Sequence, residues 1–237
     1  MTILAEAEIA SRREAALSAI ARAAEKSGRP AGSVALLAVT KGQPAELVRR
    51  AARAGFTLFG ENRVQEGSAK IEAVRAEFPG LTWHLIGPLQ TNKATLALQW
   101  FAAVESMDRQ RLAERLEKIL AGSDRRLPVL LEINLAAEAS KSGVAPGEAL
   151  SLARTVAACR HLEIRGVMAV PPFDPDPERS RPHFRKLKEL RDRIADGLGR
   201  SLPEISAGMS HDFTVAAEEG ATEVRLGTVL FGPREAA

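Results

Sequence analysis

The 237 residues are enough for one large domain, and a single α/β barrel needs about this length. Hydrophobic residues make up 45% of the chain and charged residues 27%, which excludes disorder on a large scale. Thirty-three basic against thirty acidic residues leave a net charge of only +3, so the composition is a weak indication of a nucleic-acid partner, and we expect none.

The N-terminal region lacks the uninterrupted apolar core of a signal peptide, because Glu6, Glu8, Arg12 and Arg13 are interleaved with its apolar residues. Nowhere do eighteen apolar residues run together, so we expect no membrane attachment. The single Cys159 lies in a helical pattern and can form no internal disulfide, as expected in a reducing compartment. We therefore expect a cytoplasmic protein.

The predicted elements begin with a helix that runs through about Glu25 and has Ile9, Leu17 and Ile20 on one face. Short apolar runs then alternate eight times with amphipathic helical stretches. The predicted strands cover residues 34–40, 57–60, 82–87, 101–106, 128–134, 163–170, 204–206 and 223–227. Helical patterns between them include residues 45–55, 64–78, 111–122 and 178–198.

Strands that alternate with helices favour parallel pairing with right-handed crossovers. Eight such units favour one α/β domain over residues 1–237, a single (β/α)8 TIM-type barrel with an extra N-terminal helix. A doubly wound open sheet is the alternative. The Pro- and Asp-rich segment 171–182 follows the sixth predicted strand as an insertion, and we expect it to be mobile.

The C-terminal ends of barrel strands share one mouth, so residues at or just past these ends are the candidates for an active site. In chain order they are Lys41, Glu61, Asn62, His84, Gly87, Glu132, Asn134, Met168, the segment 208–212, Arg225, Gly227 and Thr228.

The turns after the last two predicted strands have the composition of a phosphate site. They read GMS at residues 208–210 and LGT at residues 226–228. Glycine allows backbone N–H groups to approach an anion closely, and the hydroxyl groups donate further hydrogen bonds. Alone, either sequence would more often be ordinary turn chemistry, but the position after the seventh and eighth strands makes a phosphate site equally consistent with it.

The run LLAVTKGQP ends a predicted buried strand on Lys41, which could be solvated, paired or chemically active. A phosphate site across the mouth favours a phosphorylated carbonyl compound held by imine formation. A free lysine has a pKa of about 10.4 and is a poor nucleophile at neutral pH. A desolvated position near Arg225 would lower that pKa.

Seven motifs in this order identify a resemblance: AVTKGQP, FGENRVQE, WHLIGPLQTNK, EASKSG, GVMAV, GMSHDF and VRLGTVLFGPR. By these motifs together, the chain resembles the pyridoxal phosphate homeostasis protein family, whose fold is similar to the barrel domain of alanine racemase. The resemblance extends from Leu37 to Arg234.

The resemblance implies that pyridoxal 5′-phosphate is the cofactor and that Lys41 forms the internal aldimine with it. The other implied cofactor-binding residues are Asn62, His84, Met168, Ser210, Arg225, Gly227 and Thr228. Ser210, Gly227 and Thr228 would hold the phosphate, Arg225 would face the pyridine nitrogen, and Asn62 would contact the cofactor. His84 and Met168 would be pocket walls, although His84 could equally be a core histidine bonded to a neighbour.

Some positions depart from the common family pattern or allow two interpretations. Gly42, Pro88 and His211 replace more usual residues, which affects the rim of the pocket and not the aldimine. Lys93 and Lys141 belong to family motifs but could equally be solvated surface lysines.

The same residues favour a carrier over an enzyme. Arg225 stays charged and can only donate a hydrogen bond, so the pyridine nitrogen would remain unprotonated and would be a weak electron sink. Alanine racemase uses a tyrosine presented with an additional β-domain, whereas this chain contains no tyrosine and we expect no second domain. We therefore expect a buffer or carrier of pyridoxal phosphate without efficient catalysis, with amino acids and pyridoxal-phosphate-dependent apoenzymes as possible partners. A low-activity racemase and a Schiff-base aldolase are the alternatives.

Overall fold

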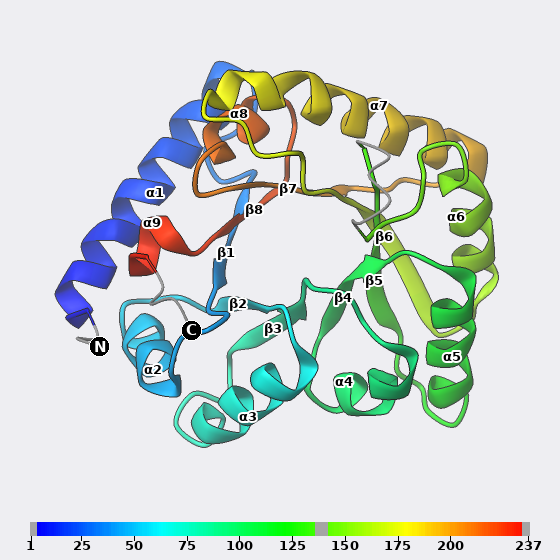
Figure 1. The fold of residues 1–237 in the computed structure, drawn as a ribbon, viewed down its shortest axis with the longest axis horizontal. Helices are drawn as coiled ribbons and strands as arrows, with labels where there is room; N and C mark the ends of the chain where they lie inside the picture. The colour runs from blue at the N-terminus through cyan, green and yellow to red at the C-terminus, as the bar shows by residue number, and fades with distance from the viewer. Residues whose placement is uncertain (1–3, 136–141, 234–237) are drawn as a thin grey trace.

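The computed structural model describes residues 4–135 and 142–233, and the strands in these ranges close into a parallel barrel (Figure 1). The strands follow each other around the barrel in chain order, and β1 pairs with β8 to close it. Their bounds are β1 Ala35–Val39, β2 Leu58–Glu61, β3 Thr82–Leu85, β4 Ala103–Met107, β5 Leu127–Glu132, β6 Leu162–Met168, β7 Glu204–Met209 and β8 Glu223–Leu226. The predicted TIM-type barrel is confirmed, and the open sheet is excluded by the pairing of β1 with β8.

Helices surround the barrel in Figure 1, and the extra helix α1 lies beside α8, α9 and α2. Their bounds are α1 Glu6–Lys26, α2 Ala45–Arg53, α3 Val64–Val74, α4 Ala94–Trp100, α5 Gln110–Leu120, α6 Ala149–Ala158, α7 Arg181–Leu198, α8 Phe213–Glu218 and α9 Thr228–Phe231. Two 3₁₀ turns, η1 Thr91–Lys93 and η2 Pro177–Ser180, precede α4 and α7.

The long helices form where apolar residues recur with helical spacing. Phe184, Leu187, Leu190 and Ile194 of α7 are all buried, which leaves the charged residues of that helix toward solvent.

Two details differ from the predicted helices. The helix predicted over residues 178–198 begins at Arg181, because the residues before it form η2. Cys159 ends α6 with an extended backbone and is half-buried, so it lies at the helix end and not within the helix.

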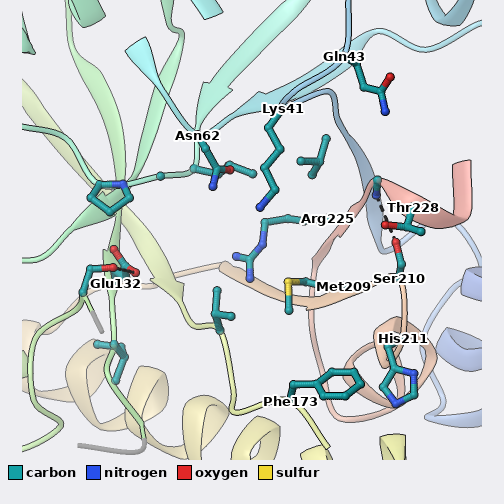
Figure 2. Close-up of a pocket in the computed structure, with 18 of the residues that line it drawn as sticks. Lys41, Gln43, Asn62, Glu132, Phe173, Met209, Ser210, His211, Arg225 and Thr228 are labelled. Atoms are coloured by element: carbon teal, nitrogen blue, oxygen red, sulfur yellow. Dashed lines mark hydrogen bonds between the residues drawn. The ribbon is translucent and has the colours of Figure 1, made fainter. Parts of the chain in front are cut away.

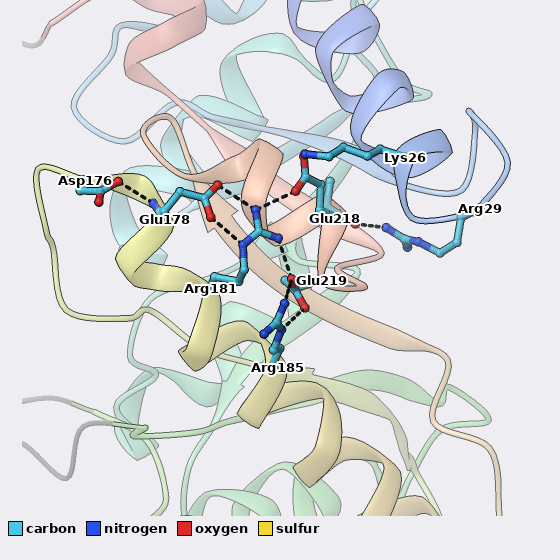
Figure 3. A network of polar contacts seen from close by, with 9 residues as sticks. Lys26, Arg29, Asp176, Glu178, Arg181, Arg185, Glu218 and Glu219 are labelled. Atoms are coloured by element: carbon cyan, nitrogen blue, oxygen red, sulfur yellow. Dashed lines mark hydrogen bonds and ion pairs between the residues drawn. The ribbon is translucent and has the colours of Figure 1, made fainter.

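A network of charged side chains joins α1, α7 and α8 on the outside of the barrel (Figure 3). Arg181 at the start of α7 donates hydrogen bonds to Glu218 at 2.7 Å and to Glu219 at 2.6 Å. Lys26 of α1 also donates to Glu218, at 2.8 Å, and Arg185 donates to Glu219, at 2.9 Å. These contacts fix α8, which directly follows the segment 208–212 at the barrel mouth.

Among the described residues, no helix combines the length and the apolar character that crossing a membrane requires.

Candidate functional site

A cavity of about 830 Å³ opens at the mouth formed by the C-terminal ends of the strands. In Figure 2, Ser210 and Thr228 lie on one side of the cavity and Glu132 on the other, with Lys41 and Arg225 between them. The lining residues include Lys41, Gln43, Asn62, Glu132, Asn134, Ser142, Phe173, Met209, Ser210, His211, Arg225, Gly227 and Thr228. A volume of this size is ordinary for a site that encloses a small ligand.

Six of the eight predicted cofactor-binding residues line this cavity: Lys41, Asn62, Ser210, Arg225, Gly227 and Thr228. The structure does not bring His84 or Met168 to it. Met168 is only 1% exposed within β6, and His84 lies within β3 with its Nδ1 2.8 Å from Oε1 of Glu105. Met168 is the last residue of β6, yet neither residue is among those that line the cavity. The contact with Glu105 gives His84 the surroundings of a core histidine bonded to a neighbour.

The remaining positions singled out by sequence are divided between the rim and the surface. Pro88 and His211 line the cavity, whereas Gly42 and Lys93 are not among its lining residues. Lys141 lies outside the described residues. His211 packs beside Phe173, with ring centroids 5.2 Å apart, and Phe173 is 77% exposed at the cavity mouth.

Lys41 reaches the cavity because β1 ends in a tight turn. The N–H of Gln43 donates to the carbonyl of Thr40 at 3.0 Å, which makes Lys41 and Gly42 the central residues of the turn. Gly42 has a φ of +71°, the left-handed conformation that a type II turn requires at this position and that glycine adopts readily. The lysine that follows the buried strand is thus placed by the turn so that its side chain lines the cavity.

Asn62 reaches the cavity from the end of β2, where the chain runs very close to the end of β3. A Cβ on Gly87 would lie 2.3 Å from the main-chain oxygen of Asn62, so only glycine fits there. Gly87 also lines the cavity. The two strand ends therefore approach each other beside Lys41.

The turns after β7 and β8 form one polar wall. Oγ of Ser210 accepts a hydrogen bond from the N–H of Gly227 at 3.3 Å (Figure 2). It accepts a second from the N–H of Val229 at 3.2 Å. Both bonds are longer than the usual N–H···O distance, so Ser210 holds the two N–H groups only weakly. Together with the hydroxyl groups of Ser210 and Thr228 they form a set of donors to which an anion could bind. The residues present therefore fit a phosphate group.

Arg225 is held rigidly at the floor of the cavity. It is 4% exposed, and its Nη1 donates to the carbonyl and Oγ of Ser206 at 3.0 and 2.9 Å. Its Nη2 donates to the carbonyl of Ala169 at 2.8 Å. A guanidinium held on two sides presents its charge at a defined point of the cavity.

Two buried carboxyl groups lie beneath Arg225 inside the barrel. Burial alone would raise the pKa of Glu105, but the hydrogen bond and charge of His84, the charge of Arg225 and the hydrogen bond of Ser206 outweigh it and lower that pKa. Burial and the neighbouring Glu105 raise the pKa of Glu223 well above its ordinary value. One ligand atom from each of His84, Glu105 and Glu223 could approach a common cation, but His84 and Ser206 already bond these carboxyl groups.

The opposite wall contains residues to which the sequence assigned no cofactor role. Glu132 is 7% exposed, and its Oε1 accepts a hydrogen bond from Oγ of Ser142 at 2.6 Å. Burial raises the pKa of Glu132. Glu132 was recognisable as a strand-end residue. Gln43, Ser142 and Met209 lie within the quoted motifs but received no individual role, and Phe173 lies in the Pro- and Asp-rich segment 171–182.

A family model described as "Alanine racemase, N-terminal domain" matches residues 15–235 of the chain. The pyridoxal phosphate homeostasis protein of Aquifex aeolicus (strain VF5) is 41% identical over 219 residues, which cover 92% of this chain and 95% of that protein. The protein of the same name from Pseudomonas aeruginosa is 44% identical over 218 residues, which cover 91% of each chain.

The structure of PipY from Synechococcus elongatus PCC7942 with pyridoxal phosphate bound is similar to this fold, with a TM-score of 0.83 and 34% identity. The match covers 94% of this chain and 100% of that one. The chain therefore belongs to the family of the alanine racemase N-terminal domain and, with relatives at about 40% identity over nearly their whole length, to the pyridoxal phosphate homeostasis proteins.

Proposed function

We propose that this protein binds pyridoxal 5′-phosphate in the cavity at the barrel mouth, holds it as a Schiff base on Lys41, and serves as a buffer or carrier in pyridoxal phosphate homeostasis. The observation that carries the proposal is the shared cavity: Lys41 and the donor set of Ser210, Gly227 and Thr228 line the same space, with Arg225 between the walls. The names of the relatives and the ligand of PipY support the choice of ligand.

The covalent step requires an amine and an aldehyde. The neutral Nζ of Lys41 attacks the aldehyde carbon, a C=N bond forms, and the carbonyl oxygen leaves as water with the two protons of the amine. The reverse reaction with water releases the ligand unchanged, as a carrier requires.

The other lining residues have separable tasks in this proposal. Ser210, Gly227 and Thr228 hold the phosphate, which fixes one end of the ligand. Asn62 contacts the ligand beside Lys41, and Arg225 donates a hydrogen bond to the pyridine nitrogen. A permanently charged donor there keeps the nitrogen unprotonated, so the ring is a poor acceptor for electrons from a bound amino acid.

Amino acids and pyridoxal-phosphate-dependent apoenzymes are the proposed acceptors of the ligand. An amino group can displace Lys41 by the same exchange of amines, which would deliver the ligand without any further chemistry. A low-activity amino-acid racemase is the second candidate, favoured by the match to the alanine racemase N-terminal domain. Against it, the chain contains no tyrosine to act as the second base.

The test is to reduce the loaded protein with borohydride, digest it and map the modified peptide. We expect the label on Lys41, and we expect the Lys41→Ala variant to lose the absorbance of the bound ligand. Lys93→Ala, at the start of α4 and outside the cavity lining, is the matched control and should bind like the wild type. A label on another lysine, with absorbance retained in Lys41→Ala, would contradict the proposal.

A further inference from the structure

We propose that Glu61 and Glu66, bridged by the buried ammonium group of Lys70, position Lys41 for Schiff-base formation by fixing the residues on both sides of it. The inference rests on the proposed Schiff base at Lys41. It assigns a role to three charged residues, here called the Lys70 cluster, that lie outside the cavity lining.

Lys70 of α3 uses all three of its N–H donors. Its Nζ lies 2.5 Å from the carbonyl oxygen of Thr40, 2.7 Å from Oε1 of Glu61 and 2.7 Å from Oε1 of Glu66. An ammonium group has three donors and no acceptor, so this arrangement satisfies it completely. The side chain of Lys70 is 8% exposed, and that of Glu61 is fully buried.

The two carboxylates bond to the residues that flank Lys41. Oγ1 of Thr40 donates to Oε1 of Glu61 at 2.6 Å. The N–H of Gly42 donates to Oε1 of Glu66 at 2.5 Å. One ammonium group therefore connects the end of β1, the end of β2 and the first turns of α3, and the peptide groups before and after Lys41 are held at fixed places.

The cost of this arrangement indicates a purpose beyond stability. Burying charges is expensive, and well-packed apolar residues can replace a buried ion pair with no loss of stability. Burial raises the pKa of Glu61, although the charge and hydrogen bond of Lys70 and the hydroxyl group of Thr40 oppose this. A turn held by charged groups keeps one orientation, whereas apolar contacts allow several.

The turn itself shows why such support matters. Gly42 has a φ of +71°, in a region that glycine enters and leaves easily, so the turn is not rigid by its own covalent structure. A displacement of about 1 Å in a reacting group can change the rate or the extent of reaction by about a hundredfold. The Lys70 cluster supplies the missing rigidity.

The test compares two ligands that differ only in the group that reacts with Lys41. Pyridoxal 5′-phosphate has an aldehyde, whereas pyridoxine 5′-phosphate has the same ring and phosphate with an alcohol in its place. In Glu66→Ala, whose wild-type side chain is 28% exposed, we expect affinity for the aldehyde to fall roughly 10- to 100-fold. We expect affinity for the alcohol to stay unchanged, because the phosphate wall is intact.

Three further variants make the result specific. Glu66→Gln retains an acceptor for the N–H of Gly42 and should restore much of the affinity for the aldehyde. Glu72→Ala, an exposed position on the same helix, is the matched control and should bind both ligands like the wild type. Thr40→Val removes only the hydroxyl group that bonds to Glu61 and should repeat the selective loss if Glu66→Ala does not fold.

The outcomes separate this inference from the proposed function. Equal loss of both ligands, or no loss of either, in folded Glu66→Ala or Thr40→Val would overturn the positioning role. Borohydride labelling of the wild type at a residue other than Lys41 would instead overturn the proposed function. Labelling at Lys41 in the wild type, with the same trapped fraction in Glu66→Ala, would overturn the positioning role alone.

Discussion

Arg225 donates a hydrogen bond from Nη1 to Oγ of Ser206 at 2.9 Å, and that oxygen also lies 2.6 Å from Oε2 of Glu105. The hydroxyl group of Ser206 thus stands between a guanidinium and a carboxylate in the barrel interior. Arg225 and Glu105 themselves are 4.0 Å apart, so the serine mediates their interaction.

The first prediction concerns this serine. Ser206→Ala leaves the buried Glu105 with one hydrogen-bond donor fewer, so we expect the free energy of unfolding to fall by about 1–3 kcal/mol. Denaturant unfolding measures it. Ser151→Ala, at an exposed position of α6, is the control and should unfold like the wild type. An unchanged midpoint for Ser206→Ala would show that the interior network does not support the fold.

The second prediction concerns the phosphate wall. Ser210→Ala or Thr228→Ala should weaken pyridoxal 5′-phosphate by about 1.5–3 kcal/mol, roughly tenfold or more in affinity, because a charge-assisted bond is lost. Unphosphorylated pyridoxal should bind each variant like the wild type. Absorbance titration with both ligands measures this, and Thr155→Ala on the outer helix α6 is the control. The same loss for both ligands would place the phosphate elsewhere.

The third prediction is that the loaded protein does not turn over amino acids at a useful rate. A second base contributes about 10²- to 10⁴-fold to a proton transfer, and the chain has no tyrosine to supply it. The measurement is incubation with L-alanine in deuterated water, in which reversible removal of the α-proton appears as deuterium at the α-carbon.

Two results of that experiment would be informative in opposite directions. Exchange and racemisation at about 1 s⁻¹ or faster would favour the racemase over the carrier. Slow exchange without racemisation would agree with proton removal from one face by Lys41, once an amino acid has displaced it.

The fourth prediction concerns the network of Figure 3 and the pH dependence of stability. Burial alone would raise the pKa of Glu218 and Glu219, but hydrogen bonds from Lys26, Arg181 and Arg185 outweigh it and lower both. A carboxyl group with a lowered pKa in the folded state stabilises the fold above its ordinary pKa of 4.5. That stability is lost as the pH falls from there through the folded-state pKa.

Arg181→Met removes the cation that both carboxylates share. We expect a loss of about 1–3 kcal/mol at neutral pH and a shallower decline of stability below about pH 4.5. Thermal unfolding over a pH series measures both effects. Lys186→Met, an exposed position on the same helix, should keep the wild-type pH profile. Parallel profiles for Arg181→Met and the wild type would exclude the network as the cause.

Much of the fold was predictable because its signals are local. The eight apolar runs and the helical spacing of residues such as Phe184 and Leu187 follow from burial on one or two faces, which neighbouring residues reveal. Short helices such as α8 and α9 provide too few turns for such a pattern to define their bounds. The strand β7 extends to Met209, whereas the predicted strand ends at residue 206. The prediction ended early because Ala207 and Gly208 give only a weak strand signal.

By itself, the sequence determined that parallel strands alternate with helices and which residues follow each strand. In a barrel those positions converge, so Lys41, Ser210 and Arg225 could be grouped although they lie far apart in the chain. The tertiary structure decided the depth of each side chain, which depends on the stagger of neighbouring strands. It left His84 and Met168 out of the cavity lining. It also brought Lys70 from a surrounding helix to the turn of Lys41, because α3 packs beside the ends of β1 and β2.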